Sequence, residues 1–196
     1  LAELAPMIGS LCLDGDQRIG PSEFIAQLEL ALRQSPNFAL RRLQVQLLAG
    51  TGAWGDGSAY AAAADALLEE AQTSQERAEA MFVKGVERLD ASQVHGAAWL
   101  EETDPIHQAR QIFESAAELA RSISLPAHLT FSIFSSAGNS HRQGSTPDPE
   151  RALALYEEAR AFGAPDAHSH AKLCKITADA LVLRDSTDDL ERAEQL

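Results

Sequence analysis

Residues 152–159 read A-L-A-L-Y-E-E-A, and this stretch decides the fold because it has counterparts elsewhere in the chain. Its first, fourth, fifth and eighth positions hold Ala152, Leu155, Tyr156 and Ala159. Residues three and four apart are neighbours on a helix, so these four side chains share one face of an α-helix. Two small and two large side chains on that face predict a helix that packs closely against its neighbour.

Three other stretches carry the same pattern. Residues 109–116 read A-R-Q-I-F-E-S-A, residues 64–71 read A-D-A-L-L-E-E-A, and residues 24–31 read F-I-A-Q-L-E-L-A as a weaker copy. Self-similarity at a regular period is the signature of a repeat architecture. The large residues at the fifth position follow one another at steps of 40, 45 and 43 residues: Leu28, Leu68, Phe113 and Tyr156.

A second apolar stretch with helical periodicity follows each copy. We therefore expect each unit to contain a first helix, here called the A helix, then a short turn, then a B helix. The expected B helices lie at residues 37–49, 75–89, 126–137 and 165–184. Glycine and polar residues fill the stretches that we expect to be loops, which are 50–58, 90–104 and 138–148.

Capping residues mark the expected helix starts. Asp104-Pro105 and Asp148-Pro149 each place an acid before a proline that can occupy the first helical position. Thr73 and Glu76 have the spacing of a capping box. The interpretation is an all-α, right-handed α-solenoid of about four antiparallel helix pairs. Its expected parts are a leading helix and loop at 1–20, four repeat units, and the start of a truncated repeat at 188–196, where a copy of the motif begins at Ala193. The four units are expected at 21–57, 58–103, 104–147 and 148–187.

The fourth unit resembles a Sel1-like repeat, a relative of the tetratricopeptide repeat. The resemblance covers residues 148–173 and rests on Ala152, Leu155-Tyr156, Ala159, Gly163 and Ala167. It is partial for 105–121 and 58–72 and slight for 21–50. Sel1-like proteins are adaptors that gather other proteins. The resemblance therefore implies a protein-interaction scaffold that binds a partner segment on the surface lined by the A helices.

Composition and charge narrow the class of partner. The chain has 196 residues, of which 45% are hydrophobic and 6% aromatic, so its core is filled mainly by Ala and Leu. Its formal net charge of −13 argues against binding to nucleic acid or to an anionic membrane surface, both of which require a basic surface. No apolar run is long enough to span a membrane, which indicates a soluble protein. The expected partner is another protein, with a basic segment favoured, and we expect the chain to be part of a longer protein or complex.

A glutamate follows the large residue in each copy of the motif. These candidate partner-binding residues are Glu29, Glu69, Glu114 and Glu157. If the A helices stack in parallel, the four carboxylates form an acidic ridge, widened by Glu70 and Glu158. The alternative is an ordinary solvated helix surface, neutralised in places by neighbours such as Arg33.

A second function hypothesis is a calcium-responsive regulator. Residues 12–24 resemble an EF-hand loop, with Asp14, Asp16 and Glu23 at positions that supply oxygen ligands. Cys12 replaces the first oxygen ligand and Gln17 replaces the glycine of the turn, so we expect no tight calcium binding and assign no metal site.

No constellation indicates catalysis or a cofactor. The six histidines form no i, i+4 pair, and the two cysteines, Cys12 and Cys174, belong to no disulfide framework or zinc motif. Motifs typical of nucleotide-binding or hydrolytic enzymes are missing from the sequence. We therefore assign no catalytic residue and no cofactor.

Overall fold

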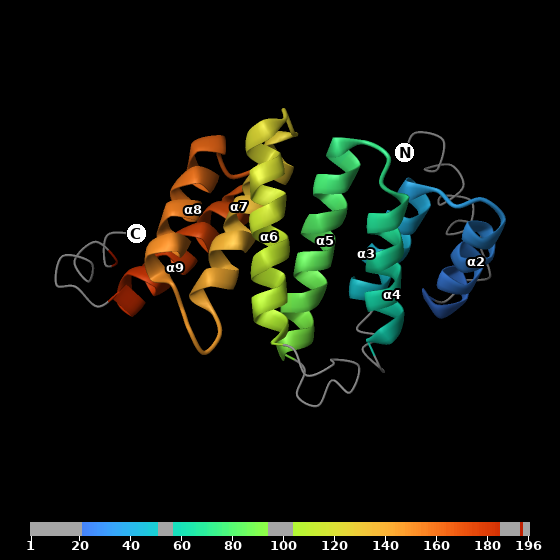
Figure 1. Cartoon of the computed structure of the whole chain (residues 1–196), viewed down its shortest axis with the longest axis horizontal. Helices are drawn as coiled ribbons and strands as arrows, with labels where there is room; N and C mark the ends of the chain where they lie inside the picture. Colours follow the sequence, from blue (N-terminus) through green and yellow to red (C-terminus); the bar gives the residue numbers. More distant parts are fainter. Residues whose placement is uncertain (1–20, 51–56, 94–103, 185–192, 194–196) are drawn as a thin grey trace. The chain divides into compact units, whose positions relative to one another are not determined.

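The structure, a computed structural model, describes residues 21–50, 57–93, 104–184 and 193, and the regular elements in these ranges are all α-helices joined by short connections. This confirms the expected all-helical class (Figure 1). The eight helices are α2 (Pro21–Gln34), α3 (Phe38–Gly50), α4 (Ser58–Glu70), α5 (Ser74–Gln93), α6 (Pro105–Ser122), α7 (Ala127–Arg142), α8 (Pro149–Phe162) and α9 (Ala167–Arg184). No helix among these is long and apolar enough to cross a membrane.

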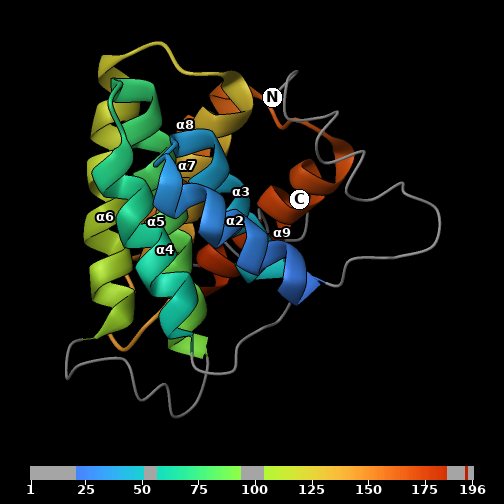
Figure 2. The same ribbon diagram turned by 90° about the vertical axis from the view of Figure 1, so that its right-hand side faces the viewer.

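The helices belong to two compact units. The first, residues Leu1–Ala71, contains α2, α3 and α4, and the second, Gln72–Leu196, contains α5 to α9. Within each unit, helices adjacent in sequence pack against each other, as Figures 1 and 2 show for α5 and α6. The division falls inside the expected repeat 58–103, so the expected repeat boundaries stay predictions.

The predicted helix starts have the predicted hydrogen bonds. Asp104 accepts a 3.0 Å hydrogen bond from the Ile106 amide, and Asp148 accepts one of the same length from the Arg151 amide. Thr73 Oγ1 accepts from the Glu76 amide at 3.1 Å, while Glu76 accepts from the Thr73 amide at 2.9 Å. These bonds satisfy helix N–H groups that have no intrahelical partner, which is why helices begin at these sites.

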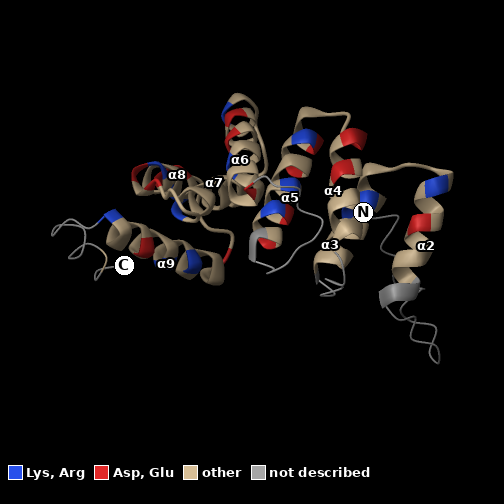
Figure 3. Cartoon of the chain, turned by 60° about the horizontal axis from the view of Figure 1, so that its bottom comes forward, with Lys and Arg blue, Asp and Glu red and all other residues tan. Residues whose placement is uncertain are grey.

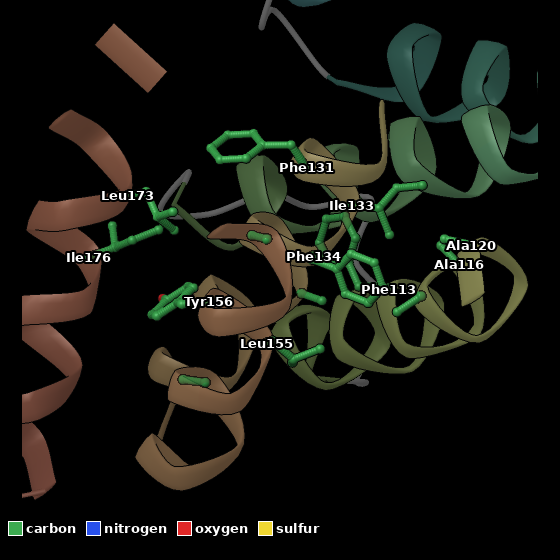
Figure 4. Packing of buried hydrophobic residues seen from close by; sticks show 14 of the residues in the cluster. Phe113, Ala116, Ala120, Phe131, Ile133, Phe134, Leu155, Tyr156, Leu173 and Ile176 are labelled. Atoms are coloured by element: carbon green, nitrogen blue, oxygen red, sulfur yellow. The ribbon is translucent and has the colours of Figure 1, made fainter. Parts of the chain in front are cut away.

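The repeated apolar face forms the core of the second unit. Seven of the eight positions predicted to be buried in its two motif copies are fully buried: Ala109, Phe113, Ala116, Ala152, Leu155, Tyr156 and Ala159. The eighth, Ile112 at the fourth position of the α6 copy, is only half-buried, so the prediction is wrong there. Figure 4 shows Phe113 close to Ile133 and Phe134, and Tyr156 facing Leu173 and Ile176 of α9. Each A helix of this unit therefore packs into the groove beside a B helix.

Two glycines inside B helices allow the closest helix contacts. A Cβ atom at Gly85 of α5 would lie 2.6 Å from Cε1 of the Phe113 ring, and one at Gly138 of α7 would overlap the ring of Tyr156. Both glycines are the twelfth residue of their helix. In α6 and α8, the aromatic residue at the fifth motif position thus packs on a glycine of the preceding B helix. A larger residue in place of either glycine would push the aromatic ring or its helix out of position.

The first unit follows the motif less closely. In α4, Ala64 and Leu67 are fully buried, whereas Leu68, the expected large core residue, is only half-buried. In α2, Leu28 is buried but Phe24 is half-buried. The buried residues of α4 are Tyr60, Ala63, Ala64 and Leu67, which have the motif's spacing but begin four residues, about one helical turn, earlier than the motif predicts.

Two expected loops, 138–148 and 90–104, begin with several helical residues. The stretch 138–148 was expected to be the most exposed loop, but α7 continues to Arg142, and Gly138, Ser140 and His141 are buried. α5 likewise continues to Gln93, beyond its expected end at residue 89. Both corrections have the same cause: packing against neighbouring helices stabilises helical turns whose glycine and polar residues favour loops locally.

We expect Gly138→Ala to destabilise the chain, because the new methyl group collides with the Tyr156 ring. Overpacking costs about 1–3 kcal/mol, which outweighs the roughly 0.5–1 kcal/mol that Ala gains over Gly within a helix. Urea unfolding followed by circular dichroism measures the difference. In a Tyr156→Leu background the same substitution should cost less, because only the contact with the Ala152 carbonyl oxygen remains. An unchanged effect there would show that the ring does not cause the loss.

We also expect Ala159→Leu to lower the free energy of unfolding by about 1–3 kcal/mol, because Ala159 is fully buried in the α8 contact face. Ala154→Leu is the matched control, since Ala154 is exposed on the same helix. Equal unfolding midpoints for the two variants would contradict the packing described for α8.

Candidate functional site

The four predicted glutamates occupy different environments. Glu69 on α4 and Glu157 on α8 are exposed, while Glu29 on α2 and Glu114 on α6 are half-buried. Figure 3 shows acidic and basic residues interleaved on α6 and α8. Glu29 and Glu69 belong to the first unit, and Glu114 and Glu157 to the second, so a continuous ridge of all four stays a prediction.

Glu114 is the centre of an ion-pair cluster that joins α6, α7 and α8. Arg151 of α8 donates to both of its carboxylate oxygens, at 2.7 Å and 2.6 Å. His141 Nε2 of α7 lies 2.8 Å from Glu114 Oε1. The hydrogen bond from Arg151 holds the pKa of Glu114 below its ordinary value. The Glu114 carboxylate therefore links three helices within the chain, whereas the sequence predicts that it binds a partner protein.

The segment after α7 is fixed by the same region. One Arg110 nitrogen, Nη2, donates to the carbonyl oxygens of Ser140, Gln143 and Thr146 at 3.1–3.4 Å. The Asp148 amide donates to the His141 carbonyl at 2.8 Å. The connection between α7 and α8 is thus anchored to α6, although residues 144–148 are exposed.

His141 is a buried titratable group within this cluster. Its side chain is only 10% exposed, and its Nδ1 is buried without a hydrogen-bond partner. Because a carboxylate can only accept, the Nε2 proton lies toward Glu114, which leaves Nδ1 as the unprotonated nitrogen of the neutral ring. Burial lowers the pKa of His141, and the hydrogen bond that His141 donates to Glu114 opposes this shift only in part.

Glu29 lines a cleft of about 330 Å³ within the first unit. It accepts a long hydrogen bond of 3.4 Å from Gln44, whose oxygen accepts from Arg41 at 3.0 Å. Arg41 also donates to Glu70 at 2.7 Å and 3.1 Å. This network connects α2, α3 and α4 and makes Glu29 part of the internal polar contacts of the unit.

A second cleft, of about 170 Å³, lies between the B helices of the second unit. Its lining comes from α5, α7 and α9 and combines aromatic, aliphatic, hydroxyl, amide and ammonium groups. The lining residues are Phe82, Phe131, Ser132, Ser135, Ser136, Asn139, Ser169, Lys172, Leu173 and Ile176. We call this site the B-helix cleft; it brings apolar and hydrogen-bonding groups together in one concave surface.

The polar groups of the B-helix cleft present both acceptors and donors. Ser132 and Ser135 donate their hydroxyl protons to main-chain carbonyls of α7, at 2.8 Å and 3.2 Å, so their oxygens remain able to accept. Asn139 accepts at its side-chain oxygen from Arg142 at 2.9 Å, so its NH₂ group remains able to donate. Lys172 adds an exposed ammonium group on α9.

Sequence reasoning did not find the B-helix cleft. Ser132, Ser135, Ser136 and Asn139 recur at helical spacing along α7, and that row of short polar side chains was the available signal. The other walls come from α5 and α9, far away in sequence, and their approach is not visible in a single helix pattern.

The remaining candidates lie mostly outside the described residues. The calcium loop at 12–24 is outside them except for its last four residues, which begin α2, and the expected repeat start at 188–196 is outside them except for Ala193. Within the described residues, no group of three or more His, Cys, Asp and Glu side chains could hold a metal ion. Cys174 Sγ lies 3.8 Å from His170 Nδ1, one helical turn apart on α9.

No model of a known protein family matches the chain, and neither the curated proteins nor the solved structures contain a match.

We expect the stability of the second unit to fall as the pH drops below about 6.5, the ordinary pKa of an unfolded histidine. Just below this pH, His141 is protonated in the unfolded chain but stays largely neutral in the folded chain, because burial lowers the pKa of His141 in the fold. The stability present above pH 6.5 is therefore lost as the pH falls toward the folded pKa.

Urea unfolding between pH 7.5 and pH 5 measures this loss, with His141→Gln as the matched control. Gln retains an N–H that can reach Glu114 but does not titrate. The variant should have a smaller pH dependence than the wild type, and parallel curves for the two proteins would contradict the assignment.

Proposed function

We propose that this chain is a helical-repeat scaffold that binds an extended segment of another protein in the B-helix cleft. The observation that supports the proposal is the mixture of groups in that cleft. Phe82 and Phe131 offer apolar surface for a side chain, while the serine oxygens and the Asn139 amide match the N–H and C=O groups of a peptide. Concave sites of this composition bind ligands through a few placed polar groups.

The dimensions of the B-helix cleft fit a short stretch of extended chain. Ser132 and Asn139 are seven residues apart on α7, which corresponds to about 10 Å along a helix axis. An extended chain covers this distance in about three residues. We therefore propose a recognition element of a few residues, oriented by hydrogen bonds to α7 and anchored by one apolar side chain.

The A-helix surface is the competing location for the partner. Glu69 and Glu157 are exposed there, and a basic segment would be steered toward them by charge. Glu114 contributes less to this surface, because Arg151 and His141 already occupy its carboxylate. We favour the B-helix cleft because it combines a concave shape, apolar surface and hydrogen-bonding groups, whereas Glu69 and Glu157 offer exposed charge.

Selection from a displayed library of random peptides, followed by anisotropy titration of the selected peptides, tests this proposal. We expect Ser136→Trp to weaken binding at least tenfold, about 1.4 kcal/mol, because the indole fills the B-helix cleft. Ser115→Trp is the matched control, since Ser115 is exposed on α6 away from the cleft.

The charge variant Glu69→Lys with Glu157→Lys separates the two surfaces. If it abolishes binding while Ser136→Trp does not, the partner uses the A helices and the B-helix cleft is not the site. If the selection yields no peptide that responds to either change, the scaffold function itself is contradicted.

A further inference from the structure

α9 has apolar side chains on two different sides. One side faces the core through Leu173, Ile176, Ala180 and Leu181, which are buried. The other side lines a shallow cleft of about 410 Å³ through His170, Ala171, Cys174, Lys175 and Ala178. Val182 and Leu183 near the end of the helix are 52% and 48% exposed. We call the side that lines this cleft, together with Val182, the outward face of α9.

The outward face of α9 has a small residue where the other B helices of this unit receive the next A helix. Ala178 is the twelfth residue of α9, as Gly85 is of α5 and Gly138 is of α7. At Gly138, the Tyr156 ring and the Ala152 carbonyl oxygen of the next A helix both approach the position of a Cβ atom. A further A helix could therefore pack against Ala178 as α8 packs against Gly138. The two helices would be slightly farther apart, because Ala178 has a methyl group.

The chain itself carries the sequence of such a helix. Residues 191–196 read E-R-A-E-Q-L and repeat the pattern of 150–155, E-R-A-L-A-L, with identical Glu, Arg, Ala and Leu at a spacing of 41 residues. Asp189 lies 41 residues after Asp148, the capping residue of α8. Ala193, at the first position of the motif, is in helical conformation.

An ion pair observed in the second unit defines the register of this contact. Arg151, just before the first motif position of α8, binds Glu114, the sixth motif position of α6. Arg192 and Glu157 occupy the same two motif positions one repeat later. The Glu157 side chain is 50% exposed and lies 3.1 Å from Arg160 of its own helix, so its carboxylate can be reached from outside α8.

We propose that α8 and the outward face of α9 form a docking surface for a further A helix, and that residues 189–196 of this chain occupy it. Arg192 binds Glu157 as Arg151 binds Glu114, and Ala193 packs near Ala178. This surface is separate from the B-helix cleft and does not depend on the proposed peptide binding.

Cys174 provides a direct probe, because its thiol lies on the outward face of α9. In the full chain carrying Cys12→Ser, we expect Arg192→Glu to speed alkylation of Cys174 by about tenfold, the change expected when a charge-assisted hydrogen-bonded pair is lost. Glu157→Arg in the same chain should restore the slow rate, because it reverses both charges. Glu158→Arg is the matched control and should not restore it, since Glu158 pairs with Arg121.

Three outcomes would overturn the proposal. Alkylation of Cys174 at the same rate in all variants would show that residues 189–196 do not cover this face. Restoration by Glu158→Arg as well as by Glu157→Arg would show that the register is wrong. Protection that rises with protein concentration, together with a dimer in sedimentation equilibrium, would assign the surface to a second copy instead. Circular dichroism of each variant confirms that the helices remain folded.

Discussion

The contact between an aromatic ring and a glycine of the preceding helix determines how the second unit is built. Tyr156 packs on Gly138, and Phe113 packs on Gly85, at distances that a side chain on either glycine would prevent. Interiors are close-packed, so this approach determines which atoms of the neighbouring helices can meet. It allows alanines such as Ala152 and Ala159 to be fully buried, and it brings α8 near enough to α6 for Arg151 to reach Glu114. The ion-pair cluster depends on this packing geometry.

The helices were predictable because their signals are local. The period of the apolar residues and the caps at Asp104 and Asp148 act within one or two turns, so the sequence alone indicates them. The continuation of α7 to Arg142 was not predictable, because Gly138 favours a loop unless a ring packs against it. Glu114 was expected to face a partner from its place on the helix face. Its pairing with Arg151 joins residues 37 positions apart and could not be read from one helix.

The two sides of the second unit differ in what they offer a partner. Its A helices carry carboxylates, two of which bind arginines of a neighbouring A helix: Glu158 binds Arg121 and Glu114 binds Arg151. Its B helices carry short hydroxyl and amide side chains beside Phe82 and Phe131. Exposed ion pairs contribute little free energy to binding, whereas a concave surface with apolar and hydrogen-bonding groups can supply both affinity and orientation. This difference is the physical reason for proposing the B-helix cleft as the site of a scaffold.

The central claim is that aromatic rings of successive A helices pack directly on glycines of the B helices. Nuclear Overhauser effects in the isotope-labelled chain test it, because they require protons to be close in space. The account predicts strong effects between the Hα protons of Gly138 and the ring protons of Tyr156, and between those of Gly85 and Phe113, with Hα shifts displaced by the ring currents. Gly163, where a Cβ atom would meet nothing within 4 Å beyond its two chain neighbours, should show no such effect to the ring of another helix. The absence of both contacts, with ordinary helical shifts at Gly85 and Gly138, would contradict the account.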